Sequence, residues 1–224
     1  MSSSPVKLQS SCPPSLRKPP TSRAQESLDF SELEDMVTFI VGPEMRRKKI
    51  HKSIVCQHSK PLSAAFNGNF VEGTTQEYVL KEYSQGTFTL FAQWLYSENL
   101  KNDDEKKIAV QDLVSLWVLA DMLIMPALQN RTIDLINEIY ISRKEIAVDV
   151  IPWVWENTAP CSPLQHLFLN MVYRDDDPKF FFLRQKDLPQ SFLSLVCGML
   201  RGDLLNHGIT HGGPSAQAMV GYYV

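Results

Sequence analysis

Cys56 lies close in the sequence to His51 and His58, and a cysteine with a neighbouring histidine base could act as a nucleophile. On a helix, however, Cys56 comes four residues after Lys52 and would point toward the core. A small buried thiol is the commoner outcome for such a cysteine. We therefore interpret Cys56 as a packing residue.

Other patterns that carry chemistry are missing from the sequence. It contains no Gly-rich loop of the G-x-G-x-x-G or Walker type that could cradle nucleotide phosphates. It has no H-E-x-x-H motif and no Cys/His cluster for zinc, and the aspartate run at residues 175–177 lacks the alternating ligands of an EF-hand. The sequence therefore predicts no cofactor, no metal site and no enzymatic activity.

The cysteines and the N-terminus bear on the cellular compartment. The cysteines stand singly, at spacings that fit neither a zinc site nor a small disulfide framework: Cys12, Cys56, Cys161 and Cys197. The first residues lack the apolar segment of a secretion signal. Single cysteines without such a signal indicate a reducing compartment, so we expect the protein in the cytoplasm, the nucleus or both.

The charge pattern argues against nucleic-acid and membrane partners. The formal net charge of −3 is too small to attract either by electrostatics alone. No apolar run reaches the roughly 18 residues of a membrane helix. The dense basic run Arg46–Lys49 could serve localisation or phosphate binding, but its place within a hairpin favours a solvated turn.

The ends of the chain differ from its body. Residues 1–30 are rich in Ser, Pro, Lys and Arg and predict a disordered arm, because they offer little apolar surface to bury. The glycines that follow Arg201 without periodicity indicate a loose end, and we expect a flexible tail at residues 206–224.

The front of the body predicts a small sheet with short helices. Met36–Val41 is a β-branched and aromatic run closed by a Gly-Pro pair, and Arg47–Ile50 would form a hairpin with it. Two short helices are expected between His51 and Phe66. Glu77–Leu80 is a candidate third strand, and Thr87–Tyr96 a further helix.

The remainder predicts helices with one apolar face each. Pro126, the capping-box pair Ser142 and Glu145, the Ser162-Pro163 pair, and Asp187 with Pro189 mark four helix starts. The expected apolar stripes are Leu113, Leu116, Trp117, Ala120, Leu123, Ile124; Leu128, Thr132, Leu135, Ile136, Ile139; Ile146, Val150, Val154; Leu164, Leu167, Phe168, Met171, Val172; and Leu188, Phe192, Leu195, Val196, Met199. A small sheet followed by a helical body is an α+β fold.

The order of these elements, with several residues in place, resembles the BTB/POZ domain. The residues that carry the resemblance are Asp35 before the first strand, His51-Lys52 at a helix start, Ser59 at the next, the loop Asn67–Glu72, the helix from Phe88 to Trp94-Leu95-Tyr96, and the helix pair that begins at Leu116. The resemblance implies a BTB/POZ fold at residues 31–140 and a helical, loosely BACK-like extension at 141–205. It is strongest to short fungal BTB proteins that carry such an extension and no kelch or zinc-finger module.

Four residues match the family's structural positions: Asp35, His51, Ser59 and Tyr96. An Asp at a strand start and a His at a helix start can hydrogen-bond and fix the sheet–helix junction, so we interpret Asp35 and His51 as structural first. The alternative is a charged pocket built from Asp35 and Lys52, as in family members that recruit other proteins there.

Phe70-Val71-Glu72 resembles the apolar-x-Glu pattern with which BTB adaptors of ubiquitin ligases dock a cullin scaffold. An apolar anchor with a charge at its rim is a common form of interface hot spot. The alternative is that Phe70 packs beneath the loop and Glu72 is solvated. Short patterns of this kind need a confirming structural context.

The resemblance implies a protein–protein interaction module that acts as an adaptor or scaffold, with a cullin as one candidate partner. The alternative is a self-associating regulator of transcription or signalling that binds no cullin. A third hypothesis is a small enzyme with a cleft between the BTB part and the extension. Only Leu28, Phe30 and Leu33 precede Asp35 as apolar residues, too few for the long first helix of many dimeric BTB domains. A strand-swapped homodimer is therefore not expected.

Overall fold

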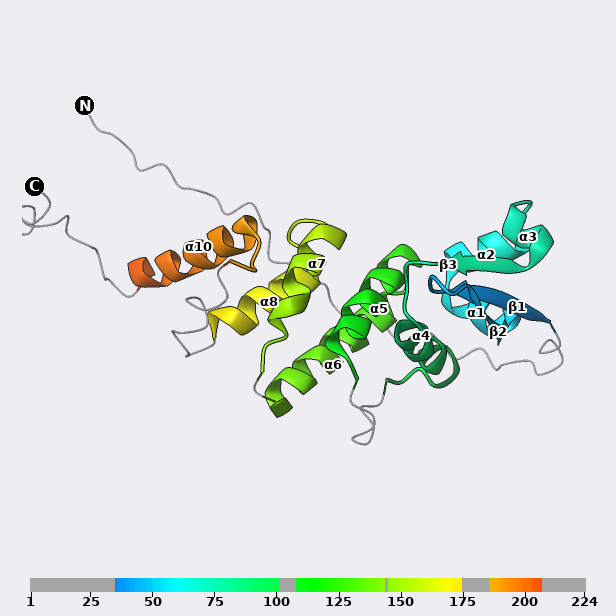
Figure 1. The fold of residues 1–224 in the computed structure, drawn as a ribbon, viewed down its shortest axis with the longest axis horizontal. Coiled ribbons are helices and arrows are strands. Elements are labelled where there is room, and N and C mark those ends of the chain that lie inside the picture. The colour runs from blue at the N-terminus through cyan, green and yellow to red at the C-terminus, as the bar shows by residue number, and fades with distance from the viewer. Residues whose placement is uncertain (1–34, 101–107, 144, 175–185, 207–224) are drawn as a thin grey trace, which may run out of the picture.

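The computed structural model describes residues 35–100, 108–143, 145–174 and 186–206 (Figure 1). Three features of the sequence analysis lie wholly or mostly outside these residues. They are the N-terminal arm at 1–30, the aspartate run at 175–177 and the tail at 206–224, of which only Asn206 is described.

The described part begins with a three-stranded mixed sheet in the order β2-β1-β3. The central strand β1 (Met36–Val41) pairs antiparallel with β2 (Arg46–His51) and parallel with β3 (Glu77–Leu80). The turn between β1 and β2 requires Gly42, whose φ of 75° lies in the left-handed region that glycine adopts freely. The bounds predicted for β1 and β3 are confirmed.

The basic run Arg46–Lys49 lies on β2 and not in a turn, which corrects the prediction of a solvated turn. The turn precedes it, and the ladder begins with Val41 opposite Arg46. Pairing along the whole of β1 extends β2 by one residue at each end of the predicted Arg47–Ile50. All four basic residues are exposed, because β2 is an edge strand.

The helices α1 (Lys52–His58), α2 (Lys60–Asn67) and α4 (Gln85–Ser97) supply the apolar residues that cover one face of the sheet. Phe39 in the central strand is fully buried there. Its ring centroid lies 5.5–6.0 Å from those of four other aromatic side chains, Phe66, Tyr78, Phe88 and Phe91. This aromatic cluster joins the sheet to the helices.

A short helix, α3 (Val71–Thr75), occupies part of the segment that the sequence predicts as a loop. Gly68 before this helix and Gly73 within it allow the close backbone contacts that the segment makes. The segment between α2 and β3 is therefore ordered by packing that no local pattern of apolar residues announces.

Two longer helices complete the BTB-like part. α5 (Val110–Met122) and α6 (Pro126–Arg143) pack against each other, and α4 contacts α5 (Figure 1). The apolar stripe predicted on α6 is fully buried, as is the α5 stripe up to Leu123. Ile124 is the exception: it is 65% exposed and has a φ of 52°, because it makes the turn between the helices.

The helical extension continues from α6. It consists of the 3₁₀ helix η2 (Val148–Val150), α7 (Ile151–Asn157), α8 (Pro163–Tyr173) and α10 (Gln190–Asn206), with α10 at the end of the described part farthest from the sheet (Figure 1). The predicted cap at Ser162 is confirmed, since its hydroxyl accepts a hydrogen bond from the Gln165 amide at 3.2 Å.

Three predictions about this extension are wrong. Ser142 does not begin a helix, because α6 continues through it to Arg143 and residues 145–147 are not helical. Residues 201–206 belong to α10, so the loose end does not begin at Arg201, and the glycines at 208, 212 and 213 lie outside the described residues. Leu195 is 41% exposed, because α10 contacts α8 through the face that carries Phe192 and Val196.

Among the described residues, no helix combines the length and the hydropathy that a bilayer crossing requires.

Candidate interaction surface

Two exposed apolar side chains stand side by side at the start of α3. Phe70 is 63% exposed and Val71 is 73% exposed, and they are the residue before the helix and its first residue. We call this pair the apolar ridge. The structure places Phe70 outside the core, which argues against the alternative that it packs beneath the loop.

The backbone around the apolar ridge is held firmly. A Cβ atom at Gly73 would lie 2.0 Å from the Gly68 carbonyl oxygen, so only glycine permits this approach. Gln76, with a φ of 53°, ends the helix and donates from Nε2 to the carbonyl oxygens of Phe66 at 3.1 Å and Gly73 at 2.6 Å. A ridge fixed in this way loses little conformational entropy when a partner binds.

Glu72, which follows Val71 in α3, is half-buried. Burial raises the pKa of the neighbouring Tyr78 phenol, and the Glu72 carboxylate raises it further. The predicted pattern therefore lies on one short segment, in which the two apolar side chains are exposed and Glu72 is half-buried.

Asp35 and Lys52, the two residues of the hypothetical charged pocket, meet through the backbone of Asp35. The Lys52 ammonium donates to the Phe66 carbonyl oxygen at 3.1 Å, where a positive charge stabilises the C-terminus of α2. Asp35 is exposed, and its backbone oxygen accepts the Lys52 amide at 2.9 Å. Among the described residues, no ion pair joins the two side chains, and the charged pocket stays a hypothesis.

His51 and Tyr96 form the contact that fixes the sheet–helix junction. The His51 Nδ1 atom lies 2.7 Å from the Tyr96 hydroxyl, which also accepts the His51 amide at 3.3 Å. The sequence predicts that Asp35 supports His51, whereas the structure gives this place to Tyr96. Tyr96 near the end of α4 reaches His51 at the end of β2, while Asp35 contacts this junction through its backbone oxygen, which accepts the Lys52 amide.

Ser59 links two helix ends from a fully buried position. Its hydroxyl accepts the Leu62 amide at 3.3 Å as the cap of α2 and donates to the Leu123 carbonyl oxygen at 2.9 Å at the end of α5. The predicted helix start is confirmed, and the tie to α5 is a further contact made by tertiary packing.

The order of strands and helices from β1 to α6 agrees with the family comparison. A model of the BTB/POZ domain matches residues 26–139, about half of the chain. The chain belongs to the BTB/POZ domain family. BTB/POZ domains are non-catalytic protein–protein interaction modules, so the protein contains such a module at residues 26–139.

A solved BTB structure is also similar to this chain. The BTB (Tramtrack and Bric a brac) domain of human gigaxonin is 17% identical, and the match covers 44% of this chain and 75% of gigaxonin's domain with a TM-score of 0.34. No curated protein is a match for the chain.

Cys56 has no histidine beside it in this BTB/POZ domain. Its sulfur accepts a hydrogen bond from Asn67 Nδ2 at 3.6 Å, and it is half-buried against the core. His51 is engaged by Tyr96, and the His58 ring packs edge-on against Trp94 with centroids 5.0 Å apart. The two histidines therefore serve packing and do not activate the thiol.

His58 predicts a pH dependence of stability. Burial lowers its pKa below the ordinary value of 6.5, and Glu98, whose carboxylate lies 4.0 Å from Nε2, only partly offsets this. The folded state then binds fewer protons than the unfolded state near this pH. The stabilising contribution is complete above pH 6.5 and is lost as the pH falls through the folded-state pKa.

We expect the urea midpoint to fall more steeply between neutral pH and pH 5 for the parent than for His58→Phe. The phenyl ring preserves the packing on Trp94 but cannot titrate. Equal pH slopes for the two proteins would contradict the assignment of this effect to His58.

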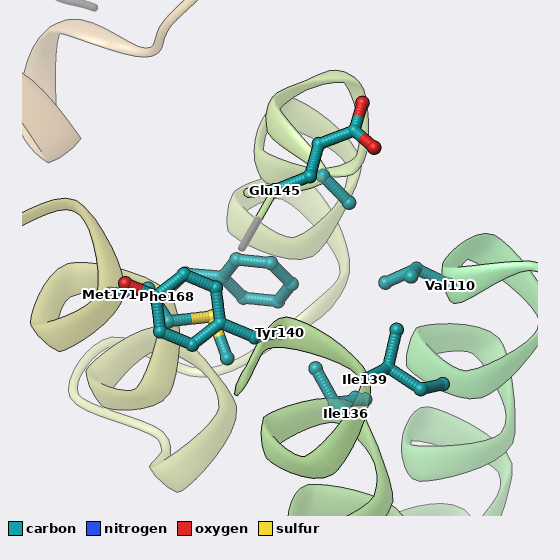
Figure 2. A pocket seen from close by; sticks show the side chains of 8 residues that line it. Val110, Ile136, Ile139, Tyr140, Glu145, Phe168 and Met171 are labelled. Atoms are coloured by element: carbon teal, nitrogen blue, oxygen red, sulfur yellow. The ribbon is translucent and has the colours of Figure 1, made fainter. Parts of the chain in front are cut away.

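A small pocket lies where α5 and α6 of the BTB part meet α8 of the extension (Figure 2). Its lining is mainly apolar, with Ile136, Ile139, Phe168 and Met171 among the side chains, and Glu145 points away from them. Its accessible volume of about 10 Å³ is roughly the space of one water molecule. The pocket does not supply the convergent polar groups that the enzyme hypothesis requires.

In the described part of the chain, no group of three or more His, Cys, Asp or Glu side chains could hold a metal ion.

The residues that the sequence analysis missed are those that support the ridge: Gly68, Gly73 and Gln76. The signal available was a pair of glycines five positions apart around an apolar pair, in a segment otherwise predicted as a loop.

Proposed function

We propose that this BTB/POZ protein is an adaptor that docks a cullin scaffold through the apolar ridge and Glu72. The observation that carries the proposal is the exposure of Phe70 and Val71, 63% and 73%, on a fixed backbone. Large apolar side chains exposed together on a rigid surface indicate a binding site.

The chemistry of the ridge supports a protein partner. Phe70 offers a rigid aromatic anchor for a pocket, and Val71 extends the apolar contact. Glu72 lies half-buried beside them and can orient a donor on the partner. The Phe70-Val71-Glu72 sequence also follows the apolar-x-Glu pattern of BTB adaptors of ubiquitin ligases.

The test is binding of the full chain to a purified cullin scaffold by calorimetry. We expect Phe70→Ala to weaken binding by about 30-fold, as loss of a hot-spot side chain does. The matched control is Ile141→Ala, because Ile141 is also 63% exposed but lies on α6. This control should bind as the parent does, and Glu72→Lys should weaken binding without changing the urea midpoint.

Absence of binding by the folded parent would remove the cullin proposal. Self-association would then be the next proposal, supported by the exposed Leu195 and Leu200 on α10, and sedimentation over a range of concentrations would test it. We also propose a kinship with the short fungal BTB proteins, on the grounds of the helical extension that follows the BTB/POZ domain.

A further inference from the structure

The free edge of the sheet at β2 carries a continuous row of positive charge. Arg46, Arg47, Lys48 and Lys49 are consecutive and all exposed, and we call them the basic edge. β2 pairs only with β1, so the backbone groups on its other side are not engaged by any strand of the described residues. An exposed strand edge is a template for pairing with another chain.

Most of this charge is not neutralised within the described part of the protein. Arg47 forms an ion pair with Glu77 across the sheet, and the other ion pairs of the described residues lie elsewhere. The formal net charge of the whole chain is −3, so the local charge at the basic edge is opposite in sign to the net charge of the protein. A local reversal of this kind selects and steers an oppositely charged partner.

The strand geometry divides the charges between the two faces. Arg46 and Lys48 lie opposite Val41 and Phe39, so they point to the helix-covered face of the sheet. Arg47 and Lys49 lie opposite Ile40 and Thr38, so they point to the other face. An added strand would have side chains directly opposite these on each face, about 5 Å away at Cβ. Acidic residues at consecutive positions of that strand would meet a basic residue on both faces.

We propose that the basic edge binds an extended acidic segment of a partner protein, which adds to the sheet as a further strand beside β2. Backbone hydrogen bonds would hold the segment, and Arg46, Lys48 and Lys49, which form no ion pair among the described residues, would select its charge. A second copy of β2 is disfavoured, because like charges would lie directly opposite each other. Nucleic acid is disfavoured by the net negative charge of the chain.

The basic edge is separate from the apolar ridge. In the strand order β2-β1-β3, β2 forms one edge of the sheet, and α3, which carries the ridge, contacts β3 at the other (Figure 1). An adaptor could therefore hold an acidic segment of one protein at one edge of the sheet and a scaffold at the other. This inference goes beyond the proposed cullin docking and does not depend on it.

The test uses the full chain and a labelled peptide in which a run of acidic residues lies between valines, followed by fluorescence anisotropy. We expect the double variant Lys48→Glu, Lys49→Glu to weaken binding at least about tenfold, and Lys48→Gln, Lys49→Gln to weaken it less. Arg201→Glu, an exposed basic position on α10, is the matched control and should bind as the parent does. Phe70→Ala should also leave peptide binding unchanged, which separates this proposal from cullin docking.

A second peptide with the same side chains but with N-methyl groups at alternate backbone nitrogens tests strand addition directly. It keeps the charge and cannot complete the ladder, so we expect its binding to be at least about tenfold weaker. Equal binding of both peptides would overturn the proposal in favour of simple charge attraction. Tighter binding of an oligonucleotide than of the acidic peptide would overturn it in favour of nucleic acid. Failure of the folded parent to bind any peptide would overturn it too, and leave the charges as protection against aggregation.

Discussion

Replacing Phe39 with alanine is expected to lower the free energy of unfolding by about 3–5 kcal/mol, the range for large-to-small changes at buried aromatic positions. Phe39 has no exposed surface and lies in the central strand, within 6.0 Å of four other aromatic rings by centroid. Its removal would leave a cavity that the sheet cannot close by moving, since β1 is paired on both sides. Urea denaturation followed by circular dichroism measures the effect.

The matched control for this variant is Phe70→Ala, which makes the same chemical change on the surface. Because Phe70 is 63% exposed, we expect a loss of no more than about 0.5 kcal/mol. The two variants together separate the contribution of Phe39 to folding from the proposed role of Phe70 in binding. A cost at Phe70 equal to that at Phe39 would contradict the structure, because it would mean that Phe70 is buried.

Replacing Ser59 with alanine is expected to cost about 1–3 kcal/mol, although the change removes a single oxygen. The Ser59 hydroxyl caps α2 through the Leu62 amide and donates to the Leu123 carbonyl oxygen, and the residue is fully buried. Both partners would lose a hydrogen bond in a place that water does not reach readily. The urea midpoint of the variant should fall with an unchanged m value.

Ser53 provides the control within the same pair of helices. Its hydroxyl is buried but has no hydrogen-bond partner among the described residues. Ser53→Ala removes an unsatisfied polar atom and improves helix propensity on α1, so we expect a change near zero or a gain of about 0.5 kcal/mol. Equal losses at both serines would show that the Leu123 contact contributes nothing.

The local elements follow from local sequence. The Met36–Val41 run is β-branched and aromatic and ends at Gly42-Pro43, and its predicted bounds are confirmed. The stripe on α6 and the Ser162 cap were also predictable, because helical periodicity and caps involve residues within three or four positions of each other. The capping-box pair Ser142 and Glu145 failed, since continued packing of α6 overrides a local start signal.

The candidate surface was predictable only in part. The Phe70-Val71-Glu72 pattern marks its place in the sequence, but its exposure depends on the Gly68–Gly73 approach and on Gln76. The basic edge illustrates the same limit. Its composition is evident from residues 46–49, whereas its position on an outer strand is a property of the sheet order.

The sequence by itself therefore determined the α+β class, the BTB/POZ resemblance, the order of the elements and most of the core. The tertiary structure decided the pairs that join distant residues: His51 with Tyr96, Lys52 with the Phe66 carbonyl, and Ser59 with the Leu123 carbonyl. The physical reason is that periodicity and capping act within one or two helical turns. These three contacts join residues 45, 14 and 64 positions apart, and they exist only once the elements have packed.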